Sequence, residues 1–200
     1  VEDHKLMKTH SVLTALLVFS LGLISLFAGT AYADESEAWE ALREGRAVLM
    51  LRHALAPGTG DPANFDVDDC STQRNLNAEG REQARAWKVY LAEHGVEEAR
   101  VFSSQWCRCL DTARGMDVGP VKEMMSLNSF FQNRSNSDMH TQQTIAIVNE
   151  MEPGLPVVLV SHQVNITALT GIYPSSNEGV VMALPLSENP TILARVSPGS

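Results

Sequence analysis

AVLMLRH, at residues 47–53, is a run of five apolar residues that ends in an arginine and a histidine. A second run of this kind, VVLVSH at residues 157–162, also ends in a histidine. Continuous apolar runs of this length are typical of parallel strands that are covered on both faces. Because open α/β sheets place their ligand sites at the carboxyl ends of such strands, we expect His53 and His162 to lie close together.

Helical patterns alternate with predicted strands along the rest of the chain. Apolar periodicity and capping residues predict helices over residues 36–44, 77–94, 106–116, 137–151 and 163–169. Strands are expected over residues 46–51, 100–103, 156–161, 179–184 and 191–196, with a short strand within residues 118–127. This order predicts one α/β domain, a three-layer α/β/α sandwich with a mostly parallel central sheet.

The charge balance limits the kinds of ligand that the chain can bind. Its 200 residues suffice for one full core, and its formal net charge of −9 argues against a nucleic-acid partner. An acidic protein that binds phosphate has to concentrate its arginines locally. Arg52, Arg74 and Arg108 are the candidates.

Histidines and arginines that meet at one sheet edge suit phosphoryl transfer. Arginine donates two hydrogen bonds from a planar fork and stays charged, so Arg52 and Arg108 are suited to hold phosphoryl oxygens. A neutral imidazole is a competent nucleophile near pH 7, and a phosphohistidine divides hydrolysis into two steps. A second histidine, if protonated, can donate to the phosphoryl oxygens. The sequence therefore predicts a phosphate pocket with a histidine nucleophile.

The N-terminus has the pattern of a secretory signal peptide. A basic segment at residues 7–10 precedes an apolar stretch over residues 12–28 and an A-x-A site that ends at Ala33. An uncleaved membrane anchor is the alternative, but small and polar residues interrupt the apolar stretch. We expect residues 1–33 to be an N-terminal extension and signal peptide, and residues 34–200 to be a periplasmic or secreted domain without a membrane span.

Three cysteines leave the pairing open. Export favours oxidation, so a disulfide from Cys70 to either Cys107 or Cys109 could brace Arg108, which lies between the last two. Buried free cysteines fit the sequence equally well. The spacing offers too few ligands for zinc, and no metal site is expected.

Four motifs occur in order along the chain: LRHA at residues 51–54, NLNAEGREQA at 75–84, SSQWCRCLDTA at 103–113 and VSH at 160–162. Together they resemble the signatures of the histidine phosphatase superfamily, which includes the phosphoglycerate mutases. The first is similar to the R-H-G/A signature, the second to the L-[ST]-x-x-G-x-x-Q-A helix start, the third to S-S-x-x-x-R-x-x-x-T-A and the last to the strand that ends in the second histidine. The similarity covers about residues 35–170 of this chain.

The resemblance implies a phosphoglycerate mutase-like fold and a phosphatase that needs no metal or organic cofactor and acts on a small phosphorylated substrate. His53 would be the nucleophile that becomes phosphorylated. Arg52 and Arg108 would clamp the phosphoryl oxygens, and His162 would complete the pocket and stabilise the transferring group.

Substrate choice is expected to reside in the loop over residues 54–74 and in the polar stretch over residues 128–136, because long loops inside compact domains are often functional. Arg74, Gln163 and Asn165 are further candidates for substrate contacts. A solvated surface position is the alternative for Arg74, and capping or packing is the alternative for Asn165. Phe130 and Phe131 are expected to pack in the core, with a substrate wall as the alternative.

The chain departs from the family pattern at the proton donor. Many members carry a glutamate after the third strand, where this chain reads SLNSFF at residues 126–131, and Gln163 rather than an acid follows the second histidine. The donor is therefore unassigned; Asp61, Glu123 and Asp138 are the candidates. Without a donor, acyl phosphates, phosphohistidine or aryl phosphates would react better than alkyl phosphates.

Two other functions remain compatible with the sequence. A non-catalytic module that binds a phosphorylated ligand would explain the missing acid, but binding alone would not require His53. A phosphomutase would need an acid and room for a bisphosphorylated intermediate, and export would separate it from glycolytic substrates. Phosphorylated cell-surface glycans or lipids are a further substrate class that an exported phosphatase could reach.

Overall fold

The computed structural model describes residues 35–199 of the chain. The predicted signal peptide and its cleavage site after Ala33 lie outside these residues. Among the helices of residues 35–199, none has both the length and the apolar character needed to cross a membrane.

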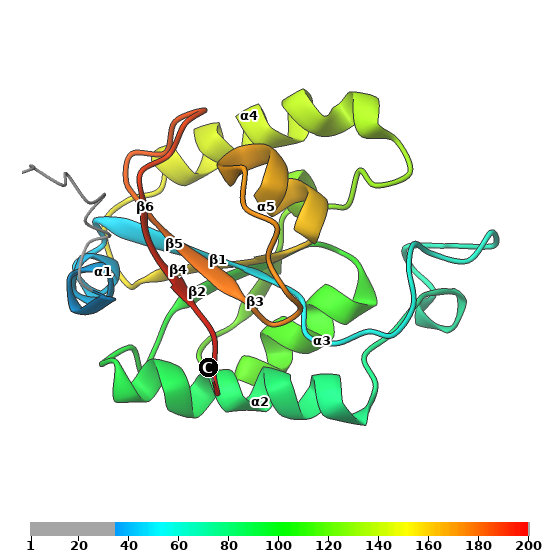
Figure 1. Cartoon of the computed structure of the whole chain (residues 1–200), viewed down its shortest axis with the longest axis horizontal. Helices are drawn as coiled ribbons and strands as arrows, with labels where there is room; N and C mark the ends of the chain where they lie inside the picture. Colours follow the sequence, from blue (N-terminus) through cyan, green and yellow to red (C-terminus); the bar gives the residue numbers. More distant parts are fainter. Residues whose placement is uncertain (1–34, 200) are drawn as a thin grey trace, which may run out of the picture. The chain divides into compact units, whose positions relative to one another are not determined.

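A six-stranded sheet with the order β3-β2-β4-β1-β5-β6 forms the centre of the described domain (Figure 1). The four strands β3, β2, β4 and β1 run parallel, and β5 and β6 are antiparallel to their neighbours. The bounds are β1 Ala47–Arg52, β2 Arg100–Ser103, β3 Val121–Glu123, β4 Val157–Ser161, β5 Gly179–Ala183 and β6 Ile192–Val196. The predicted fold class, with its mostly parallel sheet, is confirmed.

Helices cover both faces of this sheet. Figure 1 shows α2 and α3 on one side and α4 and α5 on the other, with α1 at the end of the sheet where β1 begins. The bounds are α1 Glu35–Arg43, α2 Ala78–Glu93, α3 Cys107–Met116, α4 Ser137–Asn149 and α5 Gln163–Thr170. Each predicted helix is therefore present, with ends that differ by a residue or two. The predicted strand within residues 118–127 is β3, followed by a 3₁₀ turn at Met125–Leu127.

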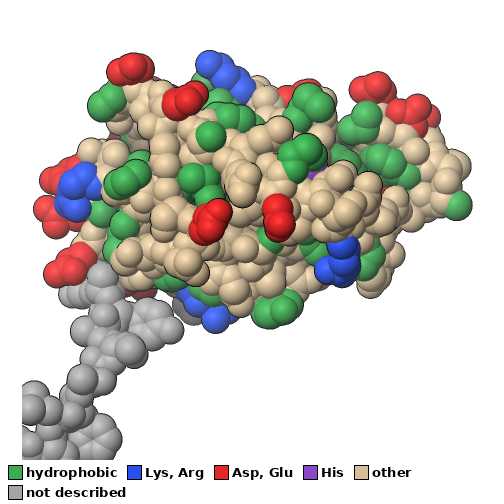
Figure 2. Space-filling view, turned by 90° about the horizontal axis from the view of Figure 1, so that it is seen from above, with side chains coloured by type: hydrophobic (Ala, Val, Ile, Leu, Met, Phe, Trp, Pro, Cys, Tyr) green, Lys and Arg blue, Asp and Glu red, His purple; other side chains and the backbone are tan. Residues whose placement is uncertain are grey.

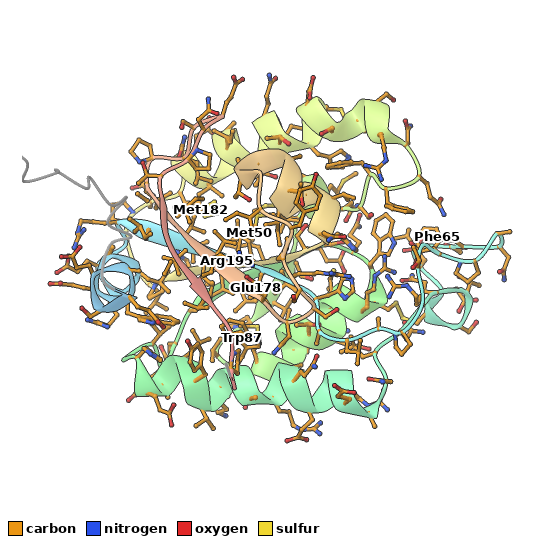
Figure 3. The ribbon with its side chains drawn as sticks, viewed as in Figure 1. Met50, Phe65, Trp87, Glu178, Met182 and Arg195 are labelled. Carbon is orange, nitrogen blue, oxygen red and sulfur yellow. A yellow bond between two sulfur atoms is a disulfide. The ribbon has the colours of Figure 1, made fainter. Side chains whose placement is uncertain are left out.

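Two clusters of the hydrophobic core, one on each face of the sheet, explain why β1 is apolar without interruption. Leu49 and Leu51 pack in the cluster that includes Trp87 of α2, whereas Val48 and Met50 pack in the cluster on the α4 and α5 side. Figure 3 shows Trp87 and Met50 on opposite sides of the sheet. Since successive side chains of a strand point to opposite faces, a strand buried on both faces must be apolar at every position.

The start of α2 fixes the segment that follows His53. Asn77 caps the helix by accepting a hydrogen bond from the Gly80 amide, as the sequence predicts. A Cβ at Gly80 would lie 2.1 Å from the Leu55 carbonyl oxygen, so this close contact requires glycine. The Gln83 side chain accepts a 2.9 Å hydrogen bond from the Leu55 amide. The helix-start motif therefore positions the residues immediately after the candidate nucleophile.

Candidate active site

The parallel strands β1 and β4 bring the two candidate histidines to one edge of the sheet. Arg52 lies in register with Ser161, so His53 and His162 follow at the same level. Their ring centroids are 5.5 Å apart, and both side chains are almost fully buried. Two histidines that are 109 positions apart in sequence are thus brought together by one strand pair.

A cavity of about 130 Å³ opens at this edge. Its lining includes Arg52, His53, Arg74, Arg108, His162 and Gln163. Asn165 does not line it: this buried side chain donates a 2.9 Å hydrogen bond to the Asn128 carbonyl and so supports the neighbouring wall. The structure therefore gathers five of the other six candidates around the candidate nucleophile His53 and gives Asn165 a packing role.

Two of the arginines that line this cavity each keep one buried donor unused. Arg52 donates from Nη1 to the Pro174 carbonyl at 3.0 Å, and Arg108 donates from both Nη atoms to Asp61. The Nε atoms of Arg52 and Arg108 are buried without a hydrogen-bond partner. A buried donor without a partner is costly, so a bound anion that accepts from both would relieve that cost.

Arg74 donates from two of its three guanidinium nitrogens to the loop to which it belongs. Its Nε donates to the Gly60 carbonyl at 2.9 Å, and its Nη1 donates to the Ala56 carbonyl. Burial and the charge of Arg108 lower the pKa of Arg74 to about 10, which keeps it positively charged at neutral pH. Arg74 thus organises the loop and adds positive charge to the cavity.

The formal charge of the cavity suits a phosphate ester. Arg52, Arg74 and Arg108 supply three positive charges and Asp61 supplies one negative charge, which leaves two positive charges. A phosphate monoester carries about −1.5 to −2 at pH 7. On the face of the molecule in Figure 2, by contrast, basic side chains are few and separated, so the positive charge is concentrated in the cavity rather than on that face.

His53 is held in the tautomer that a nucleophile needs. Its Nδ1 lies 2.8 Å from the Ala54 carbonyl oxygen, which can only accept, so Nδ1 carries the proton and Nε2 keeps its lone pair. Burial, reinforced by Arg108, lowers the pKa of His53 well below its usual 6.5. The imidazole is therefore neutral at pH 7. The Ala54 amide donates to Thr112 of α3, which fixes this geometry.

His162 is connected to a second polar chain. The Arg108 Nη2 group lies 3.5 Å from its Nδ1, so Nε2 carries the proton and donates to Ser104 Oγ at 2.8 Å. Ser104 in turn donates to the Asn128 side chain at 3.2 Å. Burial and the Arg108 charge lower the pKa of His162 as well. The protein's own groups therefore favour the neutral ring, and a protonated His162 requires the added negative charge of a substrate.

The low pKa of His53 predicts activity that persists into acid. Only neutral imidazole attacks phosphorus, so the acid limb of kcat/KM is expected below pH 6.5. The measurement is kcat/KM between about pH 4 and 8, expressed per substrate dianion because the ester itself ionises near pH 6. An acid limb at or above pH 6.5 would show that the buried environment does not depress this pKa.

The long loop over residues 54–74 is fixed to the start of α3 by side-chain contacts. Asp61 forms an ion pair with Arg108 and accepts a 3.0 Å hydrogen bond from Trp106 Nε1. The Trp106 ring stacks on Phe65, with centroids 5.0 Å apart. Figure 3 places Phe65 in this loop, away from the two core clusters. The sequence singled out Asp61 only as a candidate acid; its partner Arg108, 47 residues away, becomes visible only in the fold.

A disulfide between Cys70 and Cys107 makes a further link to the same helix. The Cys107 amide also donates to the Gln73 side chain at 2.9 Å. Cys109 is the free thiol among the described cysteines; it is buried, and burial raises its pKa to about 12. The open choice between Cys107 and Cys109 is therefore decided in favour of Cys107.

The disulfide is expected to stabilise both the protein and its cavity. Replacing Cys70 by serine should lower the free energy of unfolding by about 2–4 kcal/mol, because the unfolded chain is no longer closed into a loop and regains conformational entropy. KM should rise, since the loop that carries Asp61 and Arg74 is then held less firmly. Denaturant unfolding and steady-state kinetics with and without reductant measure both effects. Reductant should not affect the Cys70→Ser variant further; an equal effect on both proteins would contradict the assignment.

The other sequence candidates are resolved by their positions. Phe130 is buried, as expected, whereas the expectation of core packing is wrong for Phe131, which is 41% exposed and lines the cavity. Of the three candidate acids, Asp61 lines the cavity, but Glu123 and Asp138 do not. Within residues 35–199, no group of three or more His, Cys, Asp or Glu side chains is arranged to hold a metal ion.

Comparison with known proteins gives a match to a family model and a likeness in fold. Residues 48–130 match the model of the Histidine phosphatase superfamily (branch 1). No curated protein gives a significant match. The protein histidine phosphatase SixA in complex with tungstate is 21% identical with a TM-score of 0.56, and the alignment covers 76% of this chain and 97% of SixA.

Two further solved structures have the same architecture. The mycobacterial glucosyl-3-phosphoglycerate phosphatase with inorganic phosphate is 17% identical, with a TM-score of 0.52 and coverage of 78% of this chain and 98% of the other. The phosphoserine phosphatase from Entamoeba histolytica in complex with 3-phosphoglyceric acid is 14% identical, with a TM-score of 0.54 and coverage of 76% and 98%. At these identities the likeness shows the fold.

Proposed function

We propose that this chain is a member of the histidine phosphatase superfamily and hydrolyses small phosphorylated substrates through a phosphohistidine on His53. The observation that carries the proposal is the pairing of a neutral His53 with two buried arginine Nε donors that have no partner of their own. The candidate nucleophile and the two arginines that keep an unused donor thus line the same cavity.

The reaction would proceed in two steps. In the first, the Nε2 lone pair of His53 attacks phosphorus, the bond to the leaving oxygen breaks, and the Nδ1 proton stays on Nδ1, hydrogen-bonded to the Ala54 carbonyl. Arg52 and Arg108 donate to the phosphoryl oxygens and spread their charge. In the second, water attacks phosphorus, the phosphorus–nitrogen bond breaks, and phosphate leaves with His53 neutral again.

Among the described residues that line the cavity, none offers a protonated carboxyl group to the leaving oxygen. Burial alone would raise the pKa of Asp61, but hydrogen bonds from Arg108 and Trp106 outweigh it and hold the pKa below its usual value. Asp61 is therefore ionised at pH 7. The substrate's leaving group must depart with little protonation, which favours esters of acidic alcohols, acyl phosphates and phosphoramidates.

A comparison of leaving groups tests this expectation. Turnover of a series of aryl phosphates should rise steeply with the acidity of the phenol, and a sugar phosphate should react slower than any of them by about 10²-fold or more, the usual contribution of general acid catalysis. The measurement is kcat/KM for each ester. Equal rates on the aryl and sugar phosphates would point to a proton donor.

Chelator resistance and phosphoenzyme trapping test the proposal as a whole. We expect turnover of an aryl phosphate to survive chelator, because the chemistry is assigned to His53 and two arginines. Acid-labile phosphate should remain bound to the protein after rapid denaturation in alkali. Tight binding of phosphate without turnover or phosphoenzyme would favour the alternative, a module that binds phosphorylated ligands, for which the missing acid is the supporting observation.

Export belongs to the same proposal. The signal-peptide pattern of residues 1–33 supports a periplasmic or secreted protein that is cleaved after Ala33. The Cys70–Cys107 disulfide supports it too, because such bonds persist in oxidising compartments. Cell fractionation with N-terminal sequencing of the mature protein tests it. A phosphomutase is disfavoured, since it would also need the acid that the cavity lacks.

A further inference from the structure

The ion pair between Asp61 and Arg108 is an unusual element of a cavity that should receive an anion. The Arg108 side chain is 3% exposed and that of Asp61 7%. Arg108 Nη1 donates to one carboxylate oxygen at 2.5 Å, and Nη2 donates to the other at 3.2 Å. A buried pair of this kind does not add stability reliably, because desolvation of both charges offsets their attraction. Its position in the cavity calls for a functional reason.

The function of the ion pair follows from the edge of the Arg108 guanidinium to which Asp61 binds. A guanidinium has an end-on edge, made by Nη1 and Nη2, and a side-on edge that includes Nε. Asp61 takes the end-on edge, whereas Arg108 Nε is buried without a hydrogen-bond partner. The carboxylate therefore leaves the side-on donor unused. Arg52 Nε is unused in the same way.

We propose that Asp61 is a positioning residue: it holds the end-on edge of Arg108 so that the Nε edge faces the transferring phosphoryl group. This inference rests on the proposed phosphatase function. It assigns Asp61 neither the role of proton donor nor that of a carboxylate that the substrate must displace.

Asp61 is itself fixed by contacts that do not involve Arg108. Trp106 Nε1 donates to its second oxygen at 3.0 Å. The preceding residue, Gly60, has a φ of +70°, and its carbonyl accepts a hydrogen bond from Arg74 Nε. A carboxylate anchored in this way can orient the guanidinium, which otherwise sits on a flexible side chain. It also keeps the net charge of the cavity at two positive charges rather than three.

Removal of the Asp61 charge at constant shape tests the proposal. Asp61→Asn should lower kcat/KM by about 10²-fold, the effect of a misplaced catalytic group, and by the same factor for an aryl and a sugar phosphate. The loss should appear in kcat, because the positioned donor acts on the transferring group. Asp61→Glu, which keeps the charge, should recover part of the rate. Asp68→Asn, an exposed carboxylate in the same loop, is the matched control.

A double-mutant cycle with Arg108 separates positioning from a merely structural role. In the Arg108→Ala background, Asp61→Asn should have little further effect on kcat/KM, since there is no guanidinium left to orient. Full additivity of the two losses would overturn the proposal. Thermal unfolding of every variant identifies a loss of fold, and if Asp61→Asn does not fold, the same cycle is run with Asp61→Glu.

The rival roles give different results. A loss confined to the sugar phosphate would make Asp61 a general acid and overturn the proposal. Tighter binding of inorganic phosphate together with unchanged or higher kcat/KM would make Asp61 a competitor of the substrate and would also overturn it. Absence of turnover by the wild-type protein would defeat the proposed function, whereas wild-type turnover retained in Asp61→Asn would defeat only the positioning role.

Discussion

His53→Ala is expected to abolish turnover, with a loss in kcat of roughly 10⁴-fold or more, as when the nucleophile of a covalent hydrolase is removed. The alanine side chain cannot accept the phosphoryl group, and no other described residue at the cavity offers an equivalent nitrogen: His162 Nε2 is engaged with Ser104. Inorganic phosphate should still bind, because the arginine donors remain.

The decisive measurement is the trapping of a phosphoenzyme from a ³²P-labelled aryl phosphate. Wild-type protein should carry alkali-stable, acid-labile label, and His53→Ala should carry none. His94→Ala is the matched control, because His94 stacks on Trp39 and hydrogen-bonds the Tyr90 carbonyl at some distance in the fold from the cavity lining. Label retained in His53→Ala would place the nucleophile elsewhere.

Arg108→Ala is expected to lower kcat/KM by about 10³-fold or more, the range found when an arginine that stabilises a transferring phosphoryl group is lost. Two effects combine. The phosphoryl oxygens lose a charged donor, and Asp61 becomes a buried carboxylate without its strongest partner. The negative charge of Asp61 then opposes the substrate instead of compensating an arginine.

Arg108→Lys separates these contributions. Lysine keeps the charge, so the ion pair with Asp61 and the fold should persist, but it lacks the planar fork and cannot use two edges at once. We expect kcat/KM between those of Arg108→Ala and the wild type, and unfolding close to that of the wild type. Full activity of Arg108→Lys would mean that charge alone, and not the Nε edge, is used in the reaction.

The sequence predicted the scaffold of the site because its signals are local. A strand buried on both faces must be apolar throughout, so AVLML and VVLV identify β1 and β4, and their shared edge places His53 beside His162. The cap at Asn77 likewise depends on a neighbour within a few residues, the amide of Gly80.

Only the tertiary structure decided which residues of the loop and of α3 pair with one another around the pocket. The loop over residues 54–74 has no apolar periodicity from which its conformation follows. The pairing of Asp61 with Arg108 could therefore not be predicted. The same holds for the choice of Cys107 over Cys109, which are two residues apart and face different directions on one helix: one meets Cys70, the other is buried against His162. Side-chain direction on a helix and the course of an irregular loop are settled by packing over long sequence distances. The sequence therefore determined which residues could do the chemistry, and the packed fold determined which edge of Arg108 is left to do it.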